Sequence, residues 1–158
     1  MINNEVELEK ALMTGLQKAL DDTTEYYRLK LIEIIDKVVY NEEPDWYTRT
    51  MQFRDSWEAQ KAEIAGRVVE SAIFQDLFTM KWVPEMFQHG NIVEPLYPNE
   101  HALSNILNDG TDNAAYGFSP VAATHFWDEF INELNKSFDM IFLSNCKKYG
   151  VNATGKVM

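Results

Sequence analysis

Cysteine, basic residues and long apolar runs are all scarce in this chain, and each scarcity excludes a class of protein. The single cysteine, Cys146, cannot form an internal disulfide, which agrees with a reducing compartment. Fourteen Lys and Arg against 25 Asp and Glu give a net charge of −11, so the overall field repels nucleic-acid phosphates and anionic membrane surfaces. We therefore do not expect tight non-specific binding to DNA.

No apolar run approaches the roughly 18–20 residues that a membrane-spanning helix needs. Residues 1–5 also contain no basic segment followed by an apolar core, as a secretion signal would. We expect neither export nor a membrane partner, and synthesis in the cytoplasm.

The excess of acid is distributed along the sequence. Residues 1–50, 51–100 and 101–158 carry −5, −4 and −2, respectively. Two interpretations stay open: ordinary solubility, or a face kept negative so that DNA slides past without binding.

What the chain does contain is enough apolar surface for a core, because 46% of its 158 residues are hydrophobic and 13% are aromatic. We predict one domain over residues 1–150, followed by a flexible tail over 151–158.

Apolar residues recur at spacings of three, four and seven between Glu5 and Tyr40, which predicts a long amphipathic helix. The acids at Asp21 and Asp22 are interpreted as caps at a break in it, where a kink could form. Pro44 marks its end.

The residue pattern changes over residues 51–83. Aromatic and β-branched residues flank Ala65-Gly66 there, which predicts a β-hairpin or small antiparallel sheet. Helix stays an alternative for 58–78, because Glu, Ala, Gln and Lys favour it. Residues 82–98 read as loop.

Two further helices are predicted. Asn99 begins a short one that Gly110 closes. Ser119 and Pro120 begin a long one, with an apolar face from Trp127 to Phe142 and a stop at Gly150. Together these elements predict an α+β fold, in which a long N-terminal helix and a long C-terminal helix pack on a small antiparallel β-sheet or hairpin.

The chain carries none of the phosphate-binding, nucleophile-elbow or metal-binding motifs that mark common active sites. We therefore expect no catalytic residue, cofactor or metal. Two weaker alternatives remain: a metal site from His89, His101 and nearby acids, and a Cys146 thiol activated by Lys147 and Lys148. His125 is interpreted as a packing or capping residue, and Cys146 as a small buried hydrophobe.

Aromatic residues are the more informative excess. Four of them, Trp46, Tyr47, Phe53 and Trp57, lie within twelve residues, and Trp82 and others follow in loops. Such residues are enriched both in cores and in the centres of protein interfaces, so both interpretations stay open.

Three segments, in order, resemble one protein family. The segment Tyr47-Thr48-Arg49-Thr50-Met51-Gln52-Phe53-Arg54-Asp55-Ser56-Trp57 resembles the Tyr-x-Arg-Thr-Gly-x-Leu-x-x-Ser signature of the head-tail joining proteins of tailed bacteriophages, also called tail-completion, neck or minor tail components. Leu103-Ser104-Asn105-Ile106-Leu107-Asn108-Asp109-Gly110 is similar to that family's Leu-x-x-Ile-Leu-Asn-x-Gly stretch. Phe126-Trp127-Asp128 is similar to its Pro-Phe-x-x helix start.

The chain departs from the family at two places. Met51 stands where the family usually has glycine, and Thr124-His125 stand where Arg-Pro is common. The agreement in order and spacing covers roughly residues 5–150.

The resemblance implies a non-enzymatic virion protein of the neck or tail. Its subunits would form a ring between the portal or adaptor and the tail tube or tail terminator, and DNA would pass through without specific binding. The residues implied for assembly are Tyr47, Arg49, Thr50, Phe53, Ser56, Trp57, Leu103, Ile106, Leu107, Gly110, Phe126 and Trp127. The alternative from a different class is a small acidic regulator or inhibitor that binds one host partner by mimicking the charge of DNA.

Overall fold

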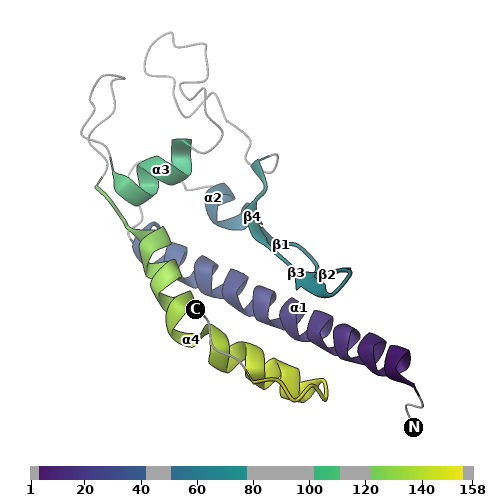
Figure 1. Cartoon of the computed structure of the whole chain (residues 1–158). Helices are drawn as coiled ribbons and strands as arrows, with labels where there is room; N and C mark the ends of the chain where they lie inside the picture. The colour runs from purple at the N-terminus through teal and green to yellow at the C-terminus, as the bar shows by residue number, and fades with distance from the viewer. Residues whose placement is uncertain (1–3, 42–50, 78–101, 111–121, 155–158) are drawn as a thin grey trace. The chain divides into compact units, whose positions relative to one another are not determined.

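The computed structural model describes residues 4–41, 51–77, 102–110 and 122–154, and the fold is α+β (Figure 1). The elements are α1 (Glu5–Val38), α2 (Gln52–Asp55), β1 (Trp57–Ala59), β2 (Glu63–Ala65), β3 (Val68–Glu70), β4 (Ile73–Gln75), α3 (Ala102–Asp109) and α4 (Phe126–Lys148). The two long helices pack with two small antiparallel two-stranded sheets, as the sequence predicts.

The chain divides into two compact units, each built from segments distant in sequence. Unit 1 contains Met1–Lys30, Trp57–Phe74 and Ile131–Met158, and unit 2 contains Leu31–Ser56 and Gln75–Phe130. Both α1 and α4 therefore contribute residues to both units. The prediction of a single domain over 1–150 stays a prediction.

The first helix is continuous, so the interpretation of Asp21 and Asp22 as caps at a break is wrong. Asp21 accepts a hydrogen bond from the backbone N–H of Ala62 at 2.6 Å. Asp22 accepts one from Lys148 Nζ and one from Tyr149 Oη, each at 2.7 Å. These two hydrogen bonds hold the pKa of the Asp22 carboxyl below its ordinary value, and the bond from Lys148 has the larger effect. Both acids therefore lie inside a continuous helix, and their side chains bind partners distant in the sequence.

Buried hydroxyl groups join α1 to α4 within unit 1. The Tyr27 hydroxyl lies 2.9 Å from Ser137 Oγ, which in turn donates to the carbonyl of Glu133. Thr23 donates to the Ala19 carbonyl and accepts from Asn145 Nδ2 at 2.9 Å. Each buried hydroxyl thus has a partner, which avoids the penalty of roughly 1–3 kcal/mol for an unsatisfied buried group.

The contact between Gly15 and the end of α4 closes unit 1. A Cβ at Gly15 would lie 2.5 Å from Val151 Cγ2, so only glycine lets α1 approach so closely. Val151 is 5% exposed and packs with Ala19 and the fully buried Cys146. The first residues of the segment predicted as a tail therefore pack against the helices, and residues 155–158 lie outside the described residues.

Burial raises the pKa of the Cys146 thiol. This agrees with the interpretation of Cys146 as a small buried hydrophobe. It is the opposite of the lowered pKa that activation by Lys147 and Lys148 would have produced.

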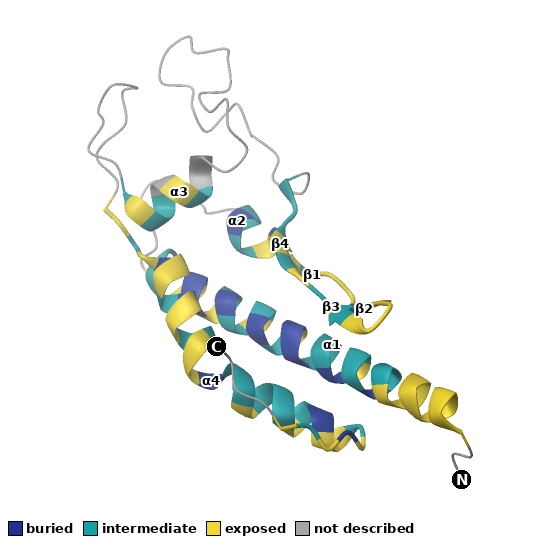
Figure 2. Cartoon of the chain, in the orientation of Figure 1, coloured by how far each residue is buried: buried dark blue, intermediate teal, exposed yellow. Residues whose placement is uncertain are grey.

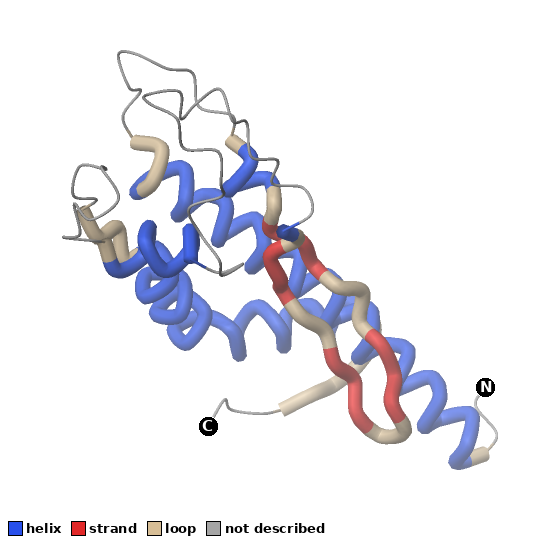
Figure 3. The backbone as a smooth tube through the Cα atoms, turned by 90° about the horizontal axis from the view of Figure 1, so that it is seen from above, coloured by secondary structure: helices blue, strands red, loops and turns tan. Residues whose placement is uncertain are grey.

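The four strands form one interrupted β-ribbon, seen from above in Figure 3. β2 and β3 pair antiparallel around Gly66, which has the left-handed φ of 64° that the turn needs. β1 pairs with β4. Next to this pair, the N–H of Gln60, which follows β1, donates to the carbonyl of Ala72, which precedes β4. The hairpin expectation for residues 51–83 is thus confirmed over Trp57–Gln75, and the described residues 58–77 contain no α-helix, the alternative considered for 58–78.

A bulge interrupts the ribbon. Two residues, Lys61 and Ala62, lie between Gln60 and Glu63 on one strand, but only Ser71 lies between Glu70 and Ala72 on the other, so one residue is extra. Side chains of α1 satisfy the backbone there: Ala62 N–H donates to Asp21, and Ala62 C=O accepts from Gln17 Nε2 at 2.6 Å. The bulge fastens the ribbon to α1 within unit 1.

The α4 helix begins at Phe126, later than the predicted start at Ser119 and Pro120, which lie outside the described residues. Residues 122–125 are not helical, so the early start is wrong. The predicted end before Gly150 is confirmed, with φ of 74° at that glycine.

The apolar face of α4 is less fully buried than its periodicity predicts (Figure 2). Phe130 is buried, but Trp127 and Ile131 are 37% and 36% exposed. Among the residues that the structure describes, no helix combines the length and hydropathy needed to cross a bilayer.

Candidate functional site

The segments that carry the family resemblance meet in unit 2, where we define a signature cluster. Its members are Phe53 and Ser56 at α2, Ser104, Leu107, Asn108 and Gly110 at α3, and Phe126 and Trp127 at the start of α4. Of the other residues predicted for assembly, Tyr47, Arg49 and Thr50 lie outside the described residues, as do the side chains of Leu103 and Ile106. Trp57 is buried in β1 and belongs to unit 1.

The short helix α2 follows a left-handed residue. Met51 has φ 58° and ψ 8°, a conformation that costs a residue with a Cβ roughly 1–2 kcal/mol relative to its right-handed form. Glycine adopts it freely. The position at which the signature has glycine is therefore one at which the backbone of this chain favours glycine.

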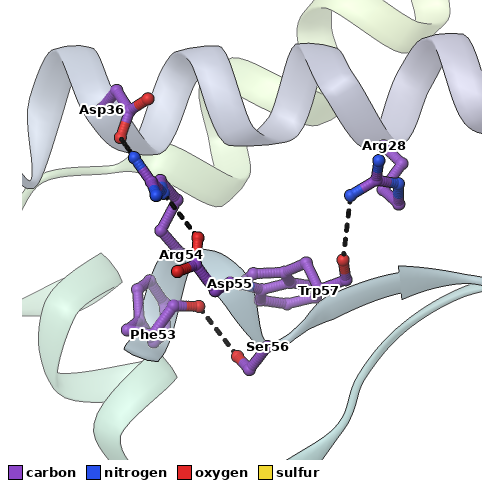
Figure 4. Close-up of polar contacts among 7 residues, drawn as sticks. All are labelled: Arg28, Asp36, Phe53, Arg54, Asp55, Ser56 and Trp57. Carbon is purple, nitrogen blue, oxygen red and sulfur yellow. Dashed lines mark hydrogen bonds and ion pairs between the residues drawn. The ribbon is translucent and has the colours of Figure 1, made fainter. Parts of the chain in front are cut away.

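Phe53 and Ser56 point inward from α2. Phe53 is 5% exposed, and its ring meets that of Phe126 edge-on, with the centroids 5.5 Å apart. Such aromatic pairs contribute about 0.5–1.5 kcal/mol beyond the burial of their area. Ser56 is fully buried and donates to the Phe53 carbonyl at 2.8 Å, which closes the helical turn (Figure 4).

A chain of side-chain hydrogen bonds leads from α2 to α3. Gln75 Nε2 donates to Ser56 Oγ at 3.2 Å, and Ser104 Oγ donates to Gln75 Oε1 at 2.7 Å. The backbone N–H of Asp76 also donates to the Ser56 carbonyl at 2.6 Å. The serine of the first motif is thereby joined through one glutamine to the second motif.

The end of α3 caps the start of α4. The Thr124 and His125 N–H groups donate to the Leu107 and Asn108 carbonyls, each at 3.0 Å. The Asn108 side-chain oxygen accepts from the Trp127 N–H at 2.9 Å. The last carbonyls of α3 thus accept hydrogen bonds from the two residues that precede α4, and the free N–H of Trp127 in the first turn of α4 is satisfied by a side chain of α3. Gly110, with φ 74°, lets the chain leave α3 here, as predicted.

His125 occupies the N-cap position of α4 with φ 51°, and its ring is exposed, 3.3 Å from Asp128. Its backbone caps the helix, whereas the packing role considered for its ring is not seen. Proline is held near φ −65°, so a proline could not occupy this position without changing the local backbone. Here the chain is built differently from the family's Pro-Phe helix start.

An ion-pair network fastens α2 to the last turns of α1, within unit 2. The Arg54 guanidinium lies 3.5 Å from Asp36 and 2.7 Å from Asp55, between the two carboxylates (Figure 4). All three side chains are partly exposed, so water screens the pairs and each contributes little alone. The network orients α2 on α1.

The cluster is built from aromatic, aliphatic, hydroxyl and amide groups, and none of its side chains ionises near neutral pH. Among the described residues no three His, Cys, Asp or Glu side chains are placed to hold a metal. His89 and His101, which the metal alternative requires, lie outside those residues.

Sequence reasoning missed the linking role of Gln75 and the capping role of Asn108. The sequence places Asn108 only within the motif that ends at Gly110, and no local pattern marks Gln75. No protein-family model, curated protein or solved structure matches the chain.

Proposed function

We propose that the chain is a non-enzymatic structural protein of a tailed-phage neck. In this proposal copies form a ring between the portal side and the tail, and DNA passes through the ring without specific binding. The acidic surface fits a channel along which phosphates must slide, because a net charge of −11 repels them.

The observation that carries the proposal is the left-handed backbone at Met51. The resemblance rests on residue types alone, and the family usually has glycine at the position that Met51 occupies here with φ 58°. Two other positions of the same signature also suit it: the apolar position holds the buried Phe53, and the serine position holds the buried, hydrogen-bonded Ser56. A chance match of letters has no reason to reproduce a glycine-type conformation.

The convergence of the three segments adds support. Phe53 and Phe126 lie 73 positions apart in the sequence, yet their rings are in contact, and Asn108 caps α4 within unit 2. Segments that pack together in one junction must keep compatible residues. A family signature made of several separate motifs fits such a junction.

The proposal is tested in purified phage particles. Mass spectrometry of virions should find the chain, and electron microscopy with a labelled copy should place it at the head-tail junction. Arg49→Ala should leave the chain folded but lower the yield of infectious particles, whereas Lys136→Ala, which removes an exposed charge on α4, should not. Absence of the chain from virions would refute the proposal.

A second candidate is the acidic inhibitor that mimics DNA, and the division of charge between the units favours it. Unit 2 contains fourteen acids and four bases, for a net charge of −10. A basic partner would be drawn to such a unit. Affinity capture that recovers one host nucleic-acid-binding protein, released by DNA, would support this candidate over the first.

A further inference from the structure

Polar contacts attach one end of the ribbon to α1, all within unit 1. We call residues 60–72, which carry the bulge, β2 and β3, the hairpin arm. Its turn residue Arg67 lies 3.0 Å from Glu9, and the Ser71 hydroxyl is hydrogen-bonded to that of Thr24. The bulge adds the two backbone bonds described above. Four side chains of α1 thus form a polar seam with the arm: Glu9, Gln17, Asp21 and Thr24.

The hairpin arm buries little of its own apolar surface. Among residues 60–72 only Ala62 is buried, and it is 2% exposed. Ile64 and Val68 are 42% and 57% exposed. Figure 2 shows the turn between β2 and β3 as exposed, in contrast to the middle of α1. A two-stranded hairpin is at best marginally stable on its own, so its attachment to the rest of unit 1 holds it in place.

The contact between α1 and α4 in the same unit is of a different kind. Ala19 and Cys146 are fully buried there, and Val151 packs against both. The rings of Tyr27 and Phe138 are stacked, with their centroids 6.0 Å apart. Separation of α4 from α1 would therefore expose apolar surface, whereas separation of the hairpin arm would expose chiefly polar groups.

We propose that the hairpin arm lifts off α1 as a unit while both long helices stay folded. Each bond of the polar seam exchanges a protein partner for water when the arm lifts, so its net contribution to docking is small. The apolar contact between α1 and α4 has no such replacement in water, because its strength follows the buried area. The ladder between β2 and β3 lies within the arm and moves with it. The movement shifts the exposed Ile64 and Val68 without opening the core of unit 1.

The amide of Ala62 reports this movement directly. Its N–H donates to Asp21 of α1, whereas the ladder bonds of β2 and β3 lie within the arm. In native-state hydrogen exchange of the full chain, followed by NMR, this amide should exchange roughly 100-fold faster than that of Thr23, a fully buried residue of α1. Low concentrations of urea should leave its exchange unchanged, because lifting the arm exposes little surface.

Two substitutions on α1 separate docking of the arm from stability of the helix. Gln17→Ala removes the bond to the Ala62 carbonyl and keeps the bond that protects the Ala62 amide. It should speed exchange of that amide by roughly three- to tenfold. Thr14→Ala is the matched control, because the Thr14 hydroxyl donates to the Lys10 carbonyl of its own helix, and it should leave the exchange unchanged. Exchange at Thr23 should be the same in both variants.

The same measurements can overturn the proposal. An Ala62 amide that exchanges as slowly as that of Thr23, with the same dependence on urea, would show that the arm separates only when the chain unfolds. Equal effects of Gln17→Ala and Thr14→Ala would show that the polar seam does not control docking. Neither result bears on the presence of the chain in virions, so the arm and the proposed function stand or fail separately.

Discussion

The left-handed conformation at Met51 makes a direct prediction about stability. Replacing Met51 by glycine removes the steric cost of φ 58°, and the greater entropy of glycine in the unfolded chain offsets part of the gain. We expect Met51→Gly to raise the free energy of unfolding by about 0.5–1 kcal/mol, measured by urea denaturation. Gln52→Gly, inside α2, should lower it. Destabilisation of Met51→Gly to the same extent as this control would contradict the assigned backbone.

Gly15 allows a second prediction, in the opposite sense. Alanine normally stabilises a helix interior over glycine by about 1 kcal/mol, but here its Cβ would clash with Val151. We expect Gly15→Ala to destabilise the chain by roughly 1–3 kcal/mol. In a Val151→Ala background the same change should become stabilising. An equal effect of Gly15→Ala in both backgrounds, by urea denaturation, would show that the contact is absent.

At the scale of single residues, the sequence predicts the role of a residue when that role depends only on its neighbours in the chain. Gly110 and Gly150 were assigned to helix ends from their neighbours, and both have the expected positive φ. Met51 could be suspected only through the family signature, because methionine carries no sign of a left-handed turn. The role of Gly15 depends on Val151, 136 positions away, and no local pattern contains it.

At the scale of elements, the joint between α3 and α4 depends on Asn108. Its side chain takes the place of an N-cap for α4 from outside that helix. Asn108→Ala should lower the free energy of unfolding by about 1 kcal/mol. Asn108→Asp keeps an acceptor near the positive end of the helix dipole but loses the hydrogen bond that Asn108 Nδ2 donates to Asp109 Oδ1 at 2.6 Å, so it should retain only part of it. Equal losses for the two variants would mean that the Trp127 N–H bond does not stabilise the joint.

The helices could be predicted from the sequence where their apolar periodicity extends over many turns. Periodicity located α1 and the end of α4, since each buries one side along many turns. The start of α4 was misplaced because Ser119-Pro120 is a strong local signal, whereas Phe126 is fixed by bonds from α3. The ribbon stayed ambiguous because its bulge at Ala62 is stabilised by Asp21 and Gln17, more than forty positions earlier.

At the scale of the molecule, the charge division was not visible in the sequence. Thirds of the chain carry −5, −4 and −2, and only the gathering of distant segments separates −1 from −10. Burial patterns reveal elements, but the assignment of segments to units depends on tertiary packing. The candidate site shows the same limit: its motifs could be read singly, and their junction could not.

The charge division also predicts how salt acts on self-association. Copies in the proposed ring repel one another through their net charge of −11, and this repulsion reaches about 30 Å at 0.01 M salt but only about 8 Å at 0.15 M. Apolar contact is not weakened by such concentrations. Sedimentation should therefore show tighter self-association as salt rises over this range. An acidic inhibitor bound to a basic partner should dissociate over the same range, because its attraction is screened. Self-association that weakens with added salt would mean that ion pairs, not apolar side chains, hold the copies together.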